Sequence, residues 1–142
     1  MPITFNHSIL AAHDRHESAR FLADVLGLEE PTSWGPFTQV RLDGGVFIQF
    51  AEPPVDEIQM QHYAFLVDEK RFEEILGRVQ ARGIPYTADP NPSRPQQINT
   101  NHGGRGFYFR DPAGHGLEVL TRPYGGAGSG LTGAGQSSSR SS

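Results

Sequence analysis

Apolar positions along this chain follow two spacings, and the two spacings alternate in a fixed order. Stretches in which apolar and polar residues alternate predict strands, and stretches with apolar residues three or four positions apart predict helices. In the first half the pattern predicts a strand at residues 3–10 and a helix at residues 17–26 that Gly27 ends. Two further strands are predicted at residues 37–42 and 46–50, joined by a glycine turn.

The second half of the chain repeats the order of the first. Its pattern predicts a strand at residues 61–67, a helix at residues 69–82 and a short strand at residues 85–87. A second hairpin is predicted from strands at residues 107–110 and 117–121. Each half therefore reads as strand, helix and strand hairpin, which predicts a duplicated α+β module.

Three segments join or follow these modules. Residues 51–59, with two adjacent prolines, read as a linker. Residues 88–105 are rich in Pro, Asn, Gln and Gly, and a loop of this length inside a compact domain is typical of a functional loop. Residues 125–142 consist mostly of Gly and Ser, so we expect a flexible tail beyond a single domain at residues 1–124.

Composition narrows the functions that this domain can have. The chain of 142 residues is long enough to bury one core, and its 36% hydrophobic residues indicate a globular protein. A net charge of −4, with scattered Lys and Arg, argues against nucleic acid as a partner. Neither a membrane span nor a secretory signal is found, so we expect a cytoplasmic protein with no membrane partner. Since cysteine is absent, His and carboxylates are the candidate metal ligands.

Two histidines and one glutamate occupy related places in the repeat. His7 lies in the opening strand of the first half, His62 in that of the second, and Glu118 in the final strand. Alternation places His62 on the face opposite Tyr63 and Phe65, which point toward the helix. Glu118 also stands opposite its apolar neighbours, where a lone buried carboxylate would be costly without a cation. We therefore predict that His7, His62 and Glu118 hold one divalent ion and leave other coordination positions open.

The alternative to a metal centre is a binding cavity that contains these three residues without a tightly bound ion. Gln49 falls near the place that Glu118 occupies in the second half, and it is either a fourth ligand or a hydrogen-bonding partner of the substrate. His13 and His16 lie in a polar connection at a helix start, where solvation and capping explain them. His115 follows a glycine in a turn, so we expect it to be exposed.

The chain resembles the vicinal oxygen chelate superfamily, which includes glyoxalase I, extradiol dioxygenases, fosfomycin-resistance thiol transferases and bleomycin-resistance proteins. The resemblance lies in the strands that carry His7 and His62, in the helix end at residues 21–28, and in the string Gly-Phe-Tyr-Phe-Arg-Asp-Pro-Ala-Gly-His-Gly-Leu-Glu at residues 106–118. That last string is the most specific part of the match.

The resemblance implies both the fold and the partners. It implies paired βαβββ modules, at about residues 3–51 and 60–122, whose mixed sheets form an open cup with the helices on the outside. It also implies one divalent metal ion, a small-molecule substrate and a homodimer. The ligand set suits Fe, Mn, Ni and Zn alike.

The resemblance leaves the reaction open. Gln49, in place of an acidic ligand, argues against a glyoxalase I-like lyase or isomerase. Tyr108 stands ten residues before Glu118, as in the extradiol dioxygenases and the fosfomycin enzymes, and His102 lies in a loop suited to acid-base catalysis. Tyr108 and His102 are therefore the candidate catalytic residues, and we favour a dioxygenase-like activity. A glyoxalase I-like lyase or isomerase, a fosfomycin-type thiol transferase and a non-catalytic, drug-binding protein are the alternatives.

Substrate selection is expected to fall to the loops at residues 30–37 and 88–105 and to a few polar or aromatic side chains. The candidate substrate contacts are Trp34, Gln39, Arg41, Gln49 and Arg105.

Overall fold

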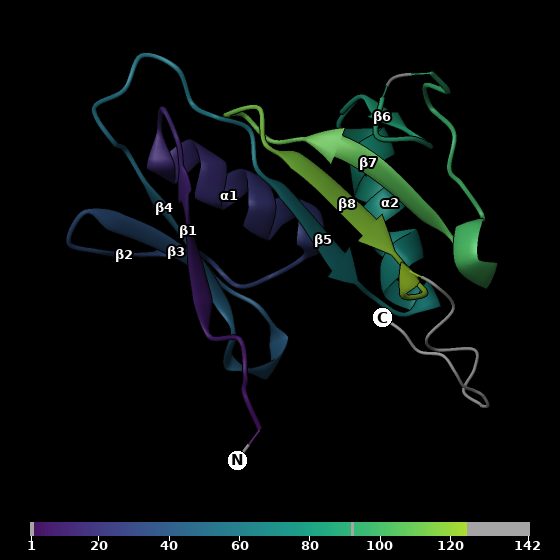
Figure 1. Ribbon diagram of the computed structural model, residues 1–142, viewed down its shortest axis with the longest axis horizontal. Coiled ribbons are helices and arrows are strands. Elements are labelled where there is room, and N and C mark those ends of the chain that lie inside the picture. Colours follow the sequence, from purple (N-terminus) through teal and green to yellow (C-terminus); the bar gives the residue numbers. More distant parts are fainter. Residues whose placement is uncertain (1, 92, 125–142) are drawn as a thin grey trace. The chain divides into compact units, whose positions relative to one another are not determined.

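The computed structural model describes residues 2–91 and 93–124, so the tail predicted at residues 125–142 lies outside the described residues. The described chain forms two four-stranded sheets, each in a module with one α-helix (Figure 1). Neither of these helices is long and apolar enough to cross a membrane.

The first module begins at residue 7 and ends at residue 51. Its elements are β1 (His7–Ala11), α1 (Arg15–Leu26), β2 (Thr32–Trp34), β3 (Phe37–Arg41), the 3₁₀ turn η1 (Asp43–Gly45) and β4 (Phe47–Ala51). The strands lie in the order β1-β4-β3-β2, with β1 parallel to β4 and the other pairs antiparallel. The sheet is therefore mixed.

Two sequence predictions for this module need correction. The first strand begins at His7 rather than at residue 3. Residues 32–34 form a strand where the sequence predicted a loop, and all three residues are exposed. This edge strand pairs with β3 alone, and its neighbours Pro31 and Gly35 are typical of a turn, so no local pattern distinguishes it from a loop.

The second module repeats the first. Its elements are β5 (His62–Leu66), α2 (Glu69–Ala81), β6 (Tyr86–Thr87), the 3₁₀ turn η2 (Asn101–Gly103), β7 (Gly106–Arg110) and β8 (Gly116–Leu120). The strand order β5-β8-β7-β6 matches that of the first sheet, and β5 and β8 run in the same direction (Figure 1). The prediction of paired βαβββ modules in an α+β fold is confirmed.

Both helices start at an aspartate that satisfies their first backbone donors. Asp14 accepts hydrogen bonds from the backbone N–H groups of His16 and Glu17, and Asp68 accepts one from Arg71. The predicted end of the first helix is also confirmed, because Gly27 takes a left-handed conformation with φ of 73°. His16 thus lies in the capped first turn of α1, as its sequence context predicted.

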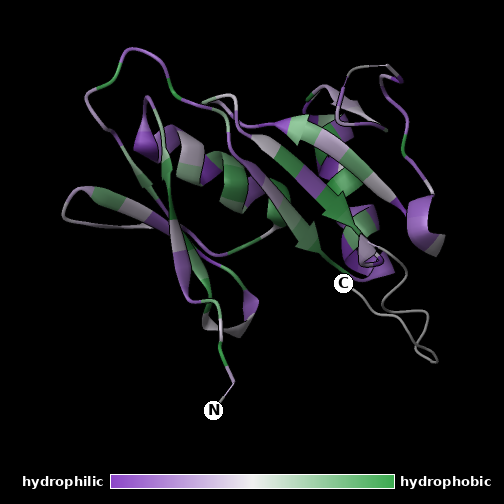
Figure 2. Cartoon of the chain, in the orientation of Figure 1, coloured by the Kyte–Doolittle hydropathy of each residue, from purple (hydrophilic) through white to green (hydrophobic). Residues whose placement is uncertain are grey.

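One face of each helix is apolar and buried, as the helical spacing predicted. Figure 2 shows hydrophobic and hydrophilic residues alternating along both helices. In α2 the buried positions are Phe72, Ile75 and Val79, each at most 1% exposed. In α1 the same spacing buries Leu22 and Leu26.

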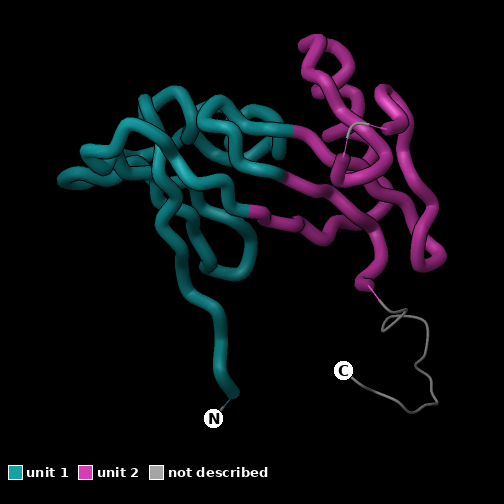
Figure 3. The backbone as a smooth tube through the Cα atoms, turned by 45° about the horizontal axis from the view of Figure 1, so that its top comes forward, with its two compact units in different colours: residues 1–61, 110–116 teal, residues 62–109, 117–142 magenta. Residues whose placement is uncertain are grey.

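The described chain divides into two compact units (Figure 3). Among the described residues, unit 1 comprises residues 2–61 and 110–116, and unit 2 comprises residues 62–91, 93–109 and 117–124. The turn between β7 and β8 thus belongs with the first module rather than with the strands that it joins.

His115 explains why this turn belongs to unit 1. Its side chain is fully buried, with Nε2 2.8 Å from the carbonyl oxygen of Ala11 and Nδ1 accepting the backbone N–H of Gln61 at 3.0 Å. Asp111 Oδ1 accepts the backbone N–H of His115 at 2.8 Å, which closes the turn. The prediction of an exposed His115 is wrong, because the turn sequence reports local conformation and not the distant backbone packed against it.

Candidate functional site

Structural equivalence between the modules supports the residues selected from the sequence. His7 is the first residue of β1, and His62 is the first residue of β5. Gln49 is the third residue of β4, and Glu118 is the third residue of β8. The two modules therefore place a histidine at the same strand position and differ at the other, where the first has an amide and the second a carboxylate.

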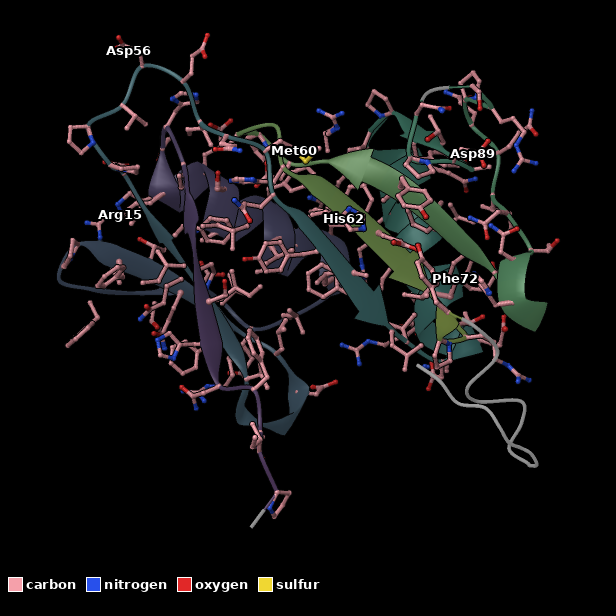
Figure 4. All side chains as sticks on the ribbon, in the orientation of Figure 1. Arg15, Asp56, Met60, His62, Phe72 and Asp89 are labelled. Carbon is pink, nitrogen blue, oxygen red and sulfur yellow. The ribbon has the colours of Figure 1, made fainter. Side chains whose placement is uncertain are left out.

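The structure brings His62 and Glu118 into direct contact on neighbouring strands of unit 2. His62 Nε2 lies 3.0 Å from Glu118 Oε1. The side chain of Glu118 is only 3% exposed, whereas that of His62 is 47% exposed, so one partner of the pair is buried and the other is accessible to solvent. Figure 4 labels His62 on β5. An ionised carboxylate this deeply buried needs such a partner, because its desolvation is otherwise uncompensated.

Two tyrosines complete the surroundings of Glu118. Tyr124 donates its hydroxyl hydrogen to Glu118 Oε2 at 2.7 Å, and its oxygen lies 2.8 Å from the hydroxyl oxygen of Tyr108. Partial burial raises the pKa of both phenols, and the nearby Glu118 charge raises them further. Both hydroxyls therefore stay protonated at neutral pH and act as hydrogen-bond donors.

The position of Tyr108 follows from the strand register. The backbone N–H of Thr121 donates to the carbonyl oxygen of Arg105, and in the same antiparallel register Tyr108 stands opposite Glu118. The ring of Tyr108 also stacks on His62, with 5.9 Å between ring centroids. The predicted catalytic tyrosine is thus beside both predicted metal ligands of unit 2.

A small open pocket with a cavity volume of about 30 Å³ lies beside Glu118 within unit 2. Its lining is mainly polar and includes Asn101, His102, Arg122 and Tyr124. The ring of His102 stacks on Tyr124, with 4.8 Å between centroids, so the predicted acid-base candidate is in the pocket wall. Sequence reasoning missed Tyr124 and Arg122, since both follow the last strand, where no periodic pattern marks a functional position.

The geometry of the pair suits a metal ion. Two ligand atoms that each lie about 2.1 Å from an ion, at right angles to one another, are about 3 Å apart. The separation of 3.0 Å between His62 Nε2 and Glu118 Oε1, which is a hydrogen bond in this structure, is compatible with this value. No group of three potential ligand side chains is found among residues 2–91 and 93–124. The donor pair therefore fits two of the three ligands predicted from the sequence.

His7, the predicted third ligand, belongs to unit 1. Its Nδ1 lies 2.6 Å from the side-chain oxygen of Asn6, and its ring stacks on Phe47 with 5.0 Å between centroids. When Nδ1 donates to Asn6, Nε2 keeps the lone pair that a metal ligand needs. Its membership in a triad stays a prediction.

The predicted substrate contacts in unit 1 lie on β2, β3 and β4. Gln49 is buried, and its Nε2 donates to Gln39 Oε1 at 3.4 Å, so the two amides form a pair. Arg41 is exposed at the end of β3, and Trp34 is 69% exposed and stacks on Phe37. Their role in substrate binding stays a prediction.

Arg105, the predicted substrate contact in unit 2, lines the pocket but has other partners. Its guanidinium forms ion pairs with Glu69 and Glu73 and lies 4.4 Å above the ring of Phe72. The two carboxylates of α2 therefore balance most of the Arg105 charge. We expect Arg105 mainly to hold the loop before β7 against α2, rather than to bind substrate.

Residues 4–119 match the family described as the Glyoxalase/Bleomycin resistance protein/Dioxygenase superfamily. The chain belongs to this superfamily. The match covers both modules, which agrees with their shared strand order and with the equivalent positions of His7 and His62. The resemblance noted from the sequence is thereby confirmed.

Three known proteins are similar to this chain over most of its length. The solved structure of the oxidase ChaP-H1 is 52% identical, with a TM-score of 0.84, over 88% of this chain and 100% of that one. Glutathione transferase FosA from Serratia marcescens is 31% identical over 82% of this chain and 79% of its own. Metallothiol transferase FosB from Shouchella clausii (strain KSM-K16) is 30% identical over 82% and 78%.

Gly104 has no side chain, which lets the His102 loop pack closely against the residues that follow β8. A Cβ atom at Gly104 would lie 2.5 Å from Arg122 Cγ and 2.6 Å from Thr121 Oγ1. We expect Gly104→Ala to displace the loop and to lower the free energy of unfolding by about 1–3 kcal/mol in chemical denaturation. Gly77→Ala is the matched control. Nothing lies within 4 Å of a Cβ there, and alanine favours a helix, so it should not destabilise. Equal unfolding midpoints for the two variants would contradict this account.

Proposed function

We propose that this chain is a metal-dependent enzyme that oxidises a small organic molecule with dioxygen. The observation that carries the proposal is the 3.0 Å separation of His62 Nε2 and Glu118 Oε1 beside an open polar pocket. Histidine and carboxylate ligands with open positions are typical of non-heme iron oxygenases. The 52% identity with a protein named as an oxidase supports oxidation rather than another reaction of the superfamily.

In this proposal His62 and Glu118 hold the ion, and His7 is the third ligand on sequence grounds. A bound divalent ion supplies Lewis acidity and, where it is redox-active, electron exchange with dioxygen. Glu118 contributes the negative charge, and its burial keeps competing water away from that side of the pair. His62 must use the Nε2 lone pair, which requires its proton to reside on Nδ1.

The remaining residues of the pocket bind and orient the substrate. Asn101 and the exposed Arg122 supply N–H donors that suit the oxygen atoms of a polar substrate. Tyr108 is close enough to His62 for its hydroxyl to reach a substrate bound beside the pair. His102, in the wall formed with Tyr124, is the proposed acid-base residue, since an imidazole gives and takes protons near neutral pH.

Thiol transfer is the second candidate function, because FosA and FosB are named as thiol transferases and share about 30% identity with this chain. In that reaction a thiolate sulfur bonds to an electrophilic carbon of the acceptor, the carbon–oxygen bond of the acceptor breaks, and no oxidant is consumed. The exposed guanidinium of Arg122 in the pocket would suit an anionic acceptor.

Metal loading and oxygen uptake test the proposal together. After anaerobic loading with Fe²⁺, Mn²⁺, Ni²⁺ or Zn²⁺, elemental analysis is expected to give about one equivalent of one of these ions. His62→Ala should reduce this to below about a tenth of an equivalent, and the exposed His16→Ala should not. An oxygen electrode should then record metal-dependent uptake with catechols.

Two results would contradict the proposal in different ways. Less than about a tenth of an equivalent with every ion would eliminate the metal centre. Consumption of glutathione with fosfomycin as acceptor, without any oxygen uptake, would replace oxidation by thiol transfer.

A further inference from the structure

Tyr124 has a position that the catalytic proposal does not use. It follows the last strand, and its hydroxyl lies 2.7 Å from Glu118 Oε2 and 2.8 Å from the hydroxyl of Tyr108. A phenol has a single hydrogen, and a carboxylate can only accept, so Tyr124 donates to Glu118. Tyr108 must therefore donate to Tyr124, which gives the three groups one direction of hydrogen bonding.

The two oxygens of Glu118 have different partners. Oε1 faces His62 Nε2, whereas Oε2 accepts from Tyr124. A glutamate side chain has three rotatable bonds, and bonds at both oxygens hold its carboxylate in one orientation. The orientation is the one in which Oε1 and His62 Nε2 have the spacing of two neighbouring metal ligands.

We propose that Tyr124 is a positioning residue of the metal centre, fixing Glu118 through Oε2 so that Oε1 faces the ion together with His62. The inference rests on the proposed metal centre and adds a residue that contacts the ligand rather than the ion. Such partners of metal ligands typically contribute about 10- to 100-fold to metal affinity.

The surroundings of Tyr124 support this role over a competing one. In the competing role, the Tyr124 hydroxyl would occupy the position of the ion and would therefore contact Oε1, the oxygen that faces His62. Tyr124 contacts Oε2 instead. Its ring is held by stacking on His102 at 4.8 Å, and its oxygen is held by Tyr108, although the residue is 56% exposed. The hydroxyl is thus already ordered, so binding an ion costs little additional conformational entropy.

Metal affinity of the full chain tests the inference with a readout that does not depend on turnover. Co²⁺ is titrated against a competing chelator, and its absorption spectrum reports ligand geometry. We expect Tyr124→Phe to weaken Co²⁺ binding about 10- to 100-fold and to alter the spectrum. Tyr86→Phe is the matched control, since it removes a hydroxyl that only accepts from Gln80 elsewhere in unit 2, and it should change affinity less than about 3-fold.

A further variant separates the bond to Glu118 from the bond between the two tyrosines. Tyr108→Phe leaves the bond between Tyr124 and Glu118 in place, so its loss of Co²⁺ affinity should be smaller than that of Tyr124→Phe. Equal or tighter Co²⁺ binding by Tyr124→Phe would overturn the inference while leaving the metal centre intact. Absence of binding by the parent chain would instead overturn the metal centre, and this inference with it.

Discussion

Replacing Glu118 with glutamine is expected to weaken divalent-metal binding by more than about 100-fold and to remove metal-dependent turnover. The amide has almost the same shape as the carboxylate, so the buried site keeps its packing. It lacks the negative charge, however, and its nitrogen cannot bind a cation. Competition with a chelator gives the affinity, and oxygen uptake gives the turnover.

Folding should not account for this effect. Because glutamine keeps the shape of the side chain and its oxygen can still accept from Tyr124, the unfolding midpoint of Glu118→Gln in denaturant should stay close to that of the parent. Glu57→Gln, at an exposed position, makes the same chemical change and should leave metal affinity and turnover unaltered. Parent-like metal affinity in Glu118→Gln would show that the contact between Glu118 and His62 is structural only.

Replacing His115 with alanine is expected to lower the free energy of unfolding by about 2–4 kcal/mol. The substitution leaves the backbone N–H of Gln61 and the carbonyl oxygen of Ala11 without their partner, and it opens a cavity where the imidazole was fully buried. Unmet buried polar groups and cavities are among the few causes of such large losses. Urea denaturation followed by circular dichroism measures the change.

The control for this prediction is another histidine of unit 1. His16 is exposed in the first turn of α1, so His16→Ala should change the free energy of unfolding by less than about 0.5 kcal/mol. A loss below about 1 kcal/mol in His115→Ala would mean that water or a backbone shift replaces the imidazole. In that case His115 would not be the residue that ties the turn to the first module.

The sequence predicted those parts of the fold that depend on local chemistry. Apolar spacing identifies α1 and α2 because a helix that packs on one side must bury one stripe, and Gly27 ends its helix because left-handed backbone favours glycine. Alternation likewise predicted that His62 stands on the face opposite Tyr63, as the burial of β5 bears out. The strand β2 was not predicted, because a short exposed edge strand has no apolar pattern of its own and is recognised only by its pairing with β3.

The candidate site divides in the same way. The repeat of strand and helix in the sequence was enough to select His7 and His62, because equivalent strand positions recur when a module is duplicated. Glu118 was selected from strand alternation, since a lone carboxylate on that face would be costly without a cation. Only the tertiary structure shows that His62 touches Glu118, that Tyr124 reaches back to its second oxygen, and that His115 is buried. These contacts join residues from separate strands and turns. Periodicity in the sequence shows which side of a segment is buried. Which residues contact that side is decided only when segments distant in the sequence pack together.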